Sequence, residues 1–207
     1  TLDVNRFTLF IVPSLLYGHA NVMHAQAEKG EQKKNVLFLI MDDMRTELNC
    51  YGAKYMKTPN MDALASQGVM FENAYCNVPV SGASRASLFS GLRPGQTRFW
   101  DVNAEIDREA PGTVTLPQYF RENGYVTISN SKVIHGKNDA KERSWTEVWM
   151  PQGTSPTWRD YLGDENLSVE KQRGGPEPFE CLDVADNAYF DGKTAEKTME
   201  DLCRLKK

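Results

Sequence analysis

The chain has 207 residues and a mildly acidic balance, with 24 Lys and Arg against 28 Asp and Glu and a formal net charge of −4. That length suffices for one domain with a sizeable core, or for part of a larger domain. The acidic balance argues against sequence-independent nucleic-acid binding, which needs a basic face, but a local group of Arg and Lys can still bind an anion.

The N-terminus has the pattern of an export signal. Arg6 precedes an apolar run at 7–18, and the motif HAQA then supplies the small-residue spacing that signal peptidase accepts. A signal peptide over 1–27 and a polar linker over 28–34 are therefore predicted, and the product is expected to be periplasmic or secreted. The alternative is a buried N-terminal helix or strand. The apolar run is too short to cross a bilayer comfortably, so no stable membrane span is expected.

The first predicted elements after the linker are a strand and a helix. Residues 35–41 form a continuous apolar run of strand length, which is typical of a strand buried on both faces in a parallel sheet. A helix is predicted over 58–68, because Thr58 is a good N-cap and Pro59 suits the first helical position. A second strand is predicted over 69–75.

Two further helices are marked by local signals. One begins near Ser81, in the sequence SGASRASLFSG. The other begins at a capping box formed by Thr115 and Gln118 and ends at Gly124. A third strand is predicted immediately afterwards, over 125–129.

The C-terminal third divides into an irregular region and a helix. Residues 136–190 show little periodicity and are rich in Trp, Pro, Gly and charge, which indicates an ordered, insertion-like loop region. Residues 192–207 form an amphipathic helix with Lys and Arg in its last turns. The alternation of strands and helices predicts an α/β fold with a largely parallel sheet, in which ligands bind beyond the carboxyl ends of the strands.

Four cysteines occur in the chain: Cys50, Cys76, Cys181 and Cys203. An exported protein could pair them, but their spacing does not give the connectivity. There is no CxxC motif, so the sequence carries no metal-thiolate signal.

Two adjacent carboxylates follow the first predicted strand. Asp42 and Asp43 lie at its carboxyl end, where two ionised groups repel each other unless a cation lies between them. Hard divalent cations such as Ca²⁺ or Mg²⁺ take oxygen ligands, so the pair is a candidate metal site. A solvated turn is the equally supported alternative.

Candidate catalytic residues occur at two other places. Ser81 and Arg85 are four residues apart and share a helix face at a helix start, which is a suitable site for an oxyanion. Lys132 and His135 follow the third predicted strand, where they could bind an anion and transfer a proton. Taken singly, each pair is better explained as a cap or an ordinary loop. Together the three strand ends describe a site for hydrolysis of a sulfate or phosphate ester.

These motifs resemble the sulfatase family. SGASR followed by ASLFSGLRP is similar to the family signature, NVLFLIMDDMR is similar to its opening strand and metal-binding Asp pair, and GYVTISNSKVIHGK is similar to the segment with its active-site Lys and His. The resemblance runs from about Asn35 to Gly136. It implies an alkaline-phosphatase-like α/β fold, with a mixed, largely parallel sheet flanked by helices, of which 35–207 would be the N-terminal part of the catalytic domain.

Within the sulfatases, three segments look most like the iduronate-2-sulfatase group: TPNMDALASQGVMFENAY, RPGQTRFWDVN and TLPQYFRENGYVT. That resemblance implies a sulfated oligosaccharide or polysaccharide as substrate, with 2-O-sulfated uronic acids of heparan or dermatan sulfate as the first candidates. Algal polysaccharides such as carrageenan or ulvan stay open as alternatives.

The resemblance also implies a modified residue and a metal. The first signature position, which the family oxidises to formylglycine, is Ser81 and not Cys76, which lies five residues too early. A serine at this position implies a radical maturase of the bacterial serine type, and Ala83 in place of the commoner Pro is tolerated in that type. Asp42, Asp43 and the modified Ser81 would then ligate Ca²⁺.

The remaining implied roles fall on three residues. Arg85 would orient the aldehyde hydrate, Lys132 would bind the sulfate and the hydrate, and His135 would assist the second proton loss. The family's later Lys-Pro-His and Asp-His or Asp-Asn motifs do not occur in this sequence. These 207 residues alone are therefore expected to be inactive.

Two other functional classes stay open at this stage. A phosphatase or phosphonate hydrolase of the related superfamily would share the metal edge of the sheet but would lack the SGASR context. A non-catalytic carbohydrate-binding relative would keep the fold without the modified residue.

Overall fold

The computed structural model describes residues 33–152, 160–169 and 179–206. The predicted signal peptide lies outside these ranges. Within them, no helix is both long enough and apolar enough to cross a membrane.

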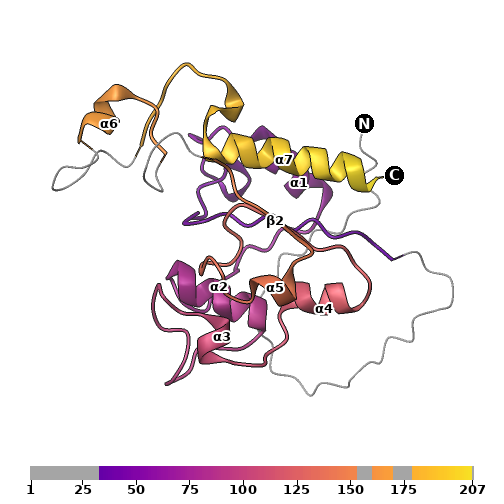
Figure 1. Cartoon of the computed structure of the whole chain (residues 1–207). Helices are drawn as coiled ribbons and strands as arrows, with labels where there is room; N and C mark the ends of the chain where they lie inside the picture. The colour runs from indigo at the N-terminus through magenta and orange to yellow at the C-terminus, as the bar shows by residue number, and fades with distance from the viewer. Residues whose placement is uncertain (1–32, 153–159, 170–178, 207) are drawn as a thin grey trace.

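A two-stranded parallel sheet lies between two groups of helices. β1 (Ile128–Asn130) pairs with β2 (Glu147–Trp149) in parallel. In Figure 1, α7 (Phe190–Leu205, yellow) lies on one side of these strands, and α2 (Ser81–Ser90) lies with several shorter helices on the other. This arrangement agrees with the predicted α/β class.

The hydrophobic core is built around α2. Its buried face carries two alanines and Phe89, and the ring of Phe89 meets the rings of Phe38 and Trp145 edge to face, each at a centroid distance of 6.3 Å. Because such ring pairs are favourable, Phe89 links three segments that are distant in sequence. Trp145 therefore belongs to the core.

The helices with strong local signals form where the sequence predicts them. α1 spans Pro59–Gln67, and α4 spans Leu116–Glu122. The capping box of α4 is present: the backbone N–H of Gln118 donates to Thr115 Oγ1 at 3.2 Å, and the backbone N–H of Thr115 donates to the Gln118 side chain at 3.4 Å. The predicted final helix is α7.

The first two predicted strands are wrong. Residues 35–41 and 69–75 form no strand: apart from a single isolated bridge at Asn35, neither segment has the backbone hydrogen bonds of a ladder with another described segment. The prediction of burial on both faces also fails for the first segment. Phe38 and Ile40 pack against the core, whereas Leu39 is 54% exposed.

The third strand and the irregular region also differ from expectation. β1 is shorter than the strand predicted over 125–129 and is shifted towards the C-terminus. The region 136–190 contains regular elements, including β2, which forms because the carbonyl of Thr127 accepts the backbone N–H groups of Thr146 and Glu147 and starts the parallel ladder. The remaining short elements are η2 (Asn49–Tyr51), α3 (Ile106–Glu109), α5 (Lys141–Ser144), α6 (Asp164–Val169) and η3 (Asp186–Ala188).

All four cysteines are free thiols in this structure. Cys50 is half-buried, and the other three are exposed. The fold of the described ranges is therefore held without disulfide bonds.

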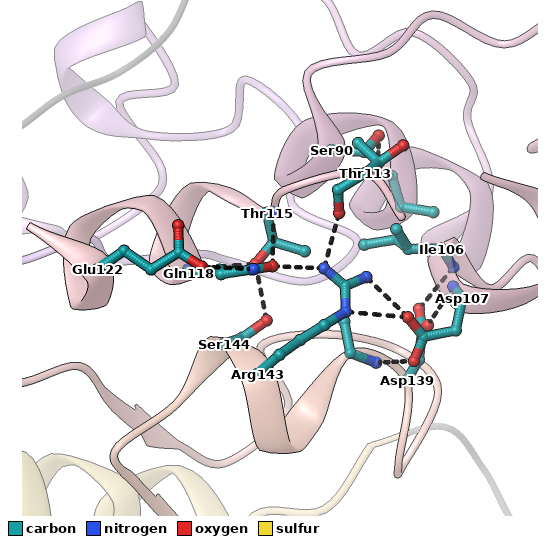
Figure 2. Close-up of polar contacts among 12 residues, drawn as sticks. Ser90, Ile106, Asp107, Thr113, Thr115, Gln118, Glu122, Asp139, Arg143 and Ser144 are labelled. Carbon is teal, nitrogen blue, oxygen red and sulfur yellow. Dashed lines mark hydrogen bonds and ion pairs between the residues drawn. The ribbon is translucent and has the colours of Figure 1, made fainter. Parts of the chain in front are cut away.

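Two carboxylates lock the starts of α3 and α5 to each other (Figure 2). Asp139 accepts the backbone N–H groups of Ile106 and Asp107 at 2.8 and 2.9 Å, and Asp107 in turn accepts the backbone N–H of Ala140 at 2.8 Å. Arg143 donates to Asp107 Oδ1 through Nε at 3.1 Å and Nη2 at 2.7 Å. The exchange satisfies backbone donors that the first turns of helices leave open.

A buried pair of hydroxyls joins this network to α4. Thr115 Oγ1 and Ser144 Oγ are 2.7 Å apart, and neither residue is exposed to solvent. Thr115 Oγ1 is thus shared between the capping box of α4 and the end of α5, which packs beside it (Figure 2).

Replacing Thr115 tests this junction. Thr115→Val keeps the shape of the side chain but leaves the Gln118 N–H and the buried Ser144 hydroxyl without their partner. We expect a loss of about 2–3 kcal/mol in the free energy of unfolding, measured by urea denaturation. Thr115→Ser, which keeps the hydroxyl, is the control and should lose less; equal losses in the two variants would contradict the assignment.

α7 is anchored to the sheet through a buried carboxylate. Asp201 is 5% exposed and accepts hydrogen bonds from Asn130 Nδ2 at 3.0 Å, Lys197 Nζ at 2.5 Å and Arg204 Nη2 at 2.9 Å. Burial alone raises the pKa of Asp201, but the hydrogen bonds from Lys197, Asn130 and Arg204 outweigh it and lower the pKa to about 2. Asp201 is therefore ionised throughout the neutral range.

This shift predicts a pH-dependent contribution to stability. Because the folded-state pKa lies below the unfolded value of 3.8, the contribution is present above about pH 4 and is lost as the pH falls through about 2. We expect Asp201→Asn to unfold more easily than the wild type by about 2 kcal/mol at pH 6, with the gap closing towards pH 2. Urea denaturation across this range measures it, and Glu200→Gln on the exposed face of α7 is the control. A gap that does not change with pH would refute the prediction.

Candidate active site

The carboxylate of Asp42 is the meeting point of three segments. Its Oδ1 accepts the Ser81 hydroxyl at 2.9 Å and Arg85 Nη2 at 3.1 Å, and its Oδ2 accepts Lys132 Nζ at 2.5 Å. Asp42 follows the apolar segment 35–41, Ser81 is the first residue of α2, and Lys132 follows β1. Ser81, Arg85 and Lys132, all singled out in the sequence, thus each lie within hydrogen-bond distance of Asp42.

Arg85 holds the loop after β1 in place. The residue is 5% exposed, and its Nη1 donates to the backbone carbonyls of Lys132 at 3.1 Å and Val133 at 2.8 Å. Its Nη2 faces Asp42. The buried guanidinium therefore satisfies two carbonyls and one carboxylate at once, a geometry that the flat fork of arginine suits.

Ser81 is not the N-cap of α2. The capping position is Val80, whereas Ser81 is the first residue within the helix and directs its hydroxyl to Asp42. The explanation of Ser81 as an ordinary cap does not hold. Gly82 follows because no side chain fits there: a Cβ would lie 2.0 Å from the carbonyl oxygen of Val102.

The charges around Asp42 keep it ionised. Partial burial raises its pKa, but the hydrogen bonds from Lys132, Arg85 and Ser81 outweigh that effect and lower the pKa to about 2. A carboxylate with so low a pKa is a poor general base at neutral pH.

His135 lies at the end of the same loop as Lys132. Burial lowers its pKa, and the positive charges of Lys132 and Arg85 lower it further against the opposing effect of Asp42. The ring is therefore largely neutral at pH 7. Its Nδ1 is buried and has no hydrogen-bond partner among the described residues.

Asp43 is placed apart from these contacts. It is exposed and adopts a left-handed backbone conformation with φ of 52°, which is uncommon outside glycine. No described residue forms a hydrogen bond with its side chain.

The oxygen donors of Asp42, Asp43 and Ser81 fit a hard cation in their chemistry. The described ranges contain no group of three or more His, Cys, Asp or Glu side chains that could hold a metal ion. Two carboxylates and one hydroxyl are also fewer than the roughly six to eight oxygens that Ca²⁺ takes.

The sequence did not predict the contact between β1 and α7 that supports the base of the Lys132 loop. Asn130 and Asp201 are 71 residues apart in sequence and are joined by a hydrogen bond of 3.0 Å. A signal for Asp201 is present, since it is a charged residue on the inward face of an amphipathic helix. Nothing local identifies Asn130 as its partner.

The sequence model of the sulfatase family matches residues 34–200 of the chain. The match includes Asp42, Asp43, Ser81, Arg85, Lys132 and His135. It extends beyond the segment 35–136 in which the motifs lie.

Three relatives illustrate the range of similar proteins. Human iduronate 2-sulfatase is 34% identical over 193 residues, covering 87% of this chain and 34% of its own length. Choline-sulfatase from Rhizobium meliloti is 30% identical over 172 residues, covering 76% of this chain and 32% of its own length. N-acetylglucosamine-6-O-sulfatase from Bacteroides thetaiotaomicron is 33% identical over 131 residues, covering 62% and 21%.

The chain spans about a third of the length of the curated relatives it matches. The match nonetheless covers most of the chain, and it includes Asp42, the start of α2 and the loop after β1, which meet in the structure. On these grounds the chain belongs to the sulfatase family.

Proposed function

We propose that the protein hydrolyses sulfate esters and that position 81 carries the reacting group. The observation that carries this proposal is the hydrogen bond of 2.9 Å from Ser81 Oγ to Asp42 Oδ1 at the start of α2, on a carboxylate that also binds Arg85 and Lys132. The hydroxyl of Ser81 is thereby held on a carboxylate whose charge two cationic side chains offset.

The electrostatics favour a modified residue over a free serine. A serine hydroxyl is a weak nucleophile unless a base takes its proton, and a carboxylate whose pKa is about 2 is unsuited to that task. Oxidation of Ser81 to formylglycine by a serine-type maturase eases this requirement, because a hydroxyl of an aldehyde hydrate is more acidic than a serine hydroxyl. The hydrated aldehyde supplies two geminal hydroxyls. One attacks sulfur while the S–O bond to the alcohol breaks and the alcohol leaves; the other then loses its proton, so that the C–O bond to the sulfate breaks and the aldehyde forms again.

The neighbouring side chains have distinct tasks in this proposal. Lys132, whose ammonium group is partly exposed, binds a sulfate oxygen and offsets its charge. His135, kept neutral by burial and by the nearby cations, accepts a proton when the sulfate leaves. Arg85 is buried and acts on position 81 through Asp42 and through the backbone of the Lys132 loop.

A calcium ion is part of the proposal. Asp42, Asp43 and the modified residue 81 would hold it through oxygen atoms, and such an ion stabilises negative charge on a sulfuryl group. The exposed position of Asp43 supports this role, since no described residue forms a hydrogen bond or ion pair with its carboxylate.

We propose a sulfated glycan as substrate, with 2-O-sulfated uronic acids as the first candidates. The support is the similarity to human and mouse iduronate 2-sulfatase, each 34% identical over nearly nine-tenths of this chain. Other relatives carry other names, including choline-sulfatase and N-acetylglucosamine-6-O-sulfatase, so carrageenan and ulvan oligosaccharides belong in the same test. Export by a signal peptide over 1–27 would bring the enzyme to such polymers.

Modification at Ser81 is directly measurable. When the full-length protein is coexpressed with a serine-type maturase, we expect the peptide containing Ser81 to lose two hydrogens, about 2 Da, by mass spectrometry. The matured protein should release sulfate from an aryl sulfate and from a 2-O-sulfated uronic acid disaccharide.

Two variants control this experiment. Ser81→Ala should fold and lose turnover, because no aldehyde can form, whereas Ser84→Ala in the same helix should mature normally. Sulfate release from a protein whose position 81 is unmodified would overturn the proposed nucleophile. Release from carrageenan or ulvan oligosaccharides alone would replace the proposed substrate.

Calcium binding can be measured without turnover. We expect Ca²⁺ at 100 times its Kd to raise the free energy of unfolding of the full-length protein by about 2.7 kcal/mol, because the ion binds only the folded state. Asp43→Ala should abolish this effect. Without calcium it should cost only the strain that alanine meets in the left-handed backbone of this position, since the side chain has no described partner. Asp183→Ala, at another exposed aspartate, is the control. Calcium stabilisation that survives in Asp43→Ala would remove Asp43 from the site.

A further inference from the structure

The loop that carries Lys132 and His135 is attached to α7 at its base. Asn130, the last residue of β1, donates through Nδ2 to Asp201 Oδ2 at 3.0 Å and to Thr198 Oγ1 at 3.2 Å. Both acceptors lie on the inward face of α7. The side chain of Asn130 therefore fixes where the sheet ends and where the loop begins.

The backbone turns sharply immediately after this anchor. Ser131 has a φ of 65°, in the left-handed region that few residues other than glycine adopt. Its N–H donates to the carbonyl of Trp149 in β2 at 2.9 Å, and its own carbonyl accepts the N–H of Val133 at 3.0 Å. Such a conformation persists only where the surrounding contacts hold it.

The residues that follow this turn lie at the candidate site. The next residue is Lys132, whose ammonium group binds Asp42 and whose carbonyl, with that of Val133, is bound by Arg85. The loop is thus held at two points: by Arg85 on the side of the site and by Asn130 on the side of α7.

We propose that Asn130 and Asp201 form a positioning pair that sets the place of Lys132 and His135 in the active site. The inference rests on the proposed function for the roles of those two residues. It requires an amide donor at 130 and an acceptor at 201, because the contact runs from Nδ2 to a carboxylate oxygen. Lys197 and Arg204 offset the charge of Asp201, which lets the carboxylate stay buried.

The same helix offers a matched control. Arg204 binds Glu147 on β2 with two bonds of 2.9 and 2.7 Å, so this pair also attaches α7 to the sheet. Glu147 contacts neither Asn130 nor Asp201, although Arg204 itself also donates to Asp201 at 2.9 Å, so the control substitution is made at Glu147. A role limited to docking α7 predicts similar effects from both attachments, whereas the positioning role predicts an effect on turnover from the Asn130 pair alone.

The test is a side-chain exchange in the full-length, matured protein. Asn130→Asp places two carboxylates against each other and should lower kcat/KM about 10- to 100-fold, the usual range for residues that orient active-site groups. The double variant Asn130→Asp/Asp201→Asn restores one donor and one acceptor in the reverse order and should recover kcat/KM to within about threefold of the wild type. Glu147→Gln should leave kcat/KM unchanged.

A second readout does not depend on turnover. Hydrogen exchange in a peptide covering 131–135 should speed up in Asn130→Asp and return to the wild-type rate in the double variant. If Asn130→Asp does not fold, Asn130→Leu replaces it as the variant that removes the amide donor. It is expected to fold, because the carboxylate of Asp201 keeps its hydrogen bonds from Lys197 and Arg204. Asn130 Oδ1 is also buried without a hydrogen-bond partner among the described residues, so an apolar group of this size loses nothing at that atom.

The outcomes separate the two proposals. Failure of the double variant to recover both kcat/KM and exchange, with the protein folded, overturns the positioning pair. An effect of Glu147→Gln equal to that of Asn130→Asp does the same. If the wild type releases sulfate from none of the esters, the proposed function falls, and hydrogen exchange alone then decides whether Asn130 and Asp201 hold the loop.

Discussion

The candidate site depends on burying the charge of Arg85 in the right place. A guanidinium that is 5% exposed is tolerated only where its donors are satisfied, and here two backbone carbonyls and the Asp42 carboxylate satisfy them. Those acceptors come from segments 43 to 48 residues away in sequence. Satisfying one buried cation therefore brings together the end of the 35–41 segment, the start of α2 and the loop after β1.

The small residues of α2 make this burial possible. Gly82 allows the backbone at Val102 to approach where a Cβ would collide with it, and buried alanines let the core close around Phe89. The helix can then sit deep enough for Arg85 to reach the carbonyls of Lys132 and Val133. The same approach fixes Ser81 at the first turn, where its hydroxyl meets Asp42.

The parts of the fold that could be predicted from the sequence are those with local causes. The capping box at Thr115 and the proline at the start of α1 are enough to begin helices, and both helices form as predicted. Strands depend on partners distant in sequence, so an apolar run such as 35–41 is a poor guide to pairing. The grouping of Asp42, Ser81, Arg85 and Lys132 was expected from the ends of predicted elements, although the strand predicted before Asp42 does not form. The contact of Asn130 with Asp201 had no local signal.

The charges at the site also bear on how an acidic chain could bind the anionic substrate proposed above. Asp42 and Asp43 carry two negative charges, and Arg85 and Lys132 carry two positive charges, while His135 is held largely neutral by burial and by these cations. These groups cancel, so on their own they would attract a sulfate ester only weakly. A divalent cation on the carboxylates would make the same site net positive without any change in the chain. Under the proposed function, the electrostatic balance around Asp42 would give the calcium ion a role in substrate binding as well as in chemistry. Affinity for a sulfated glycan would then depend on the ion more than on the overall charge of the protein.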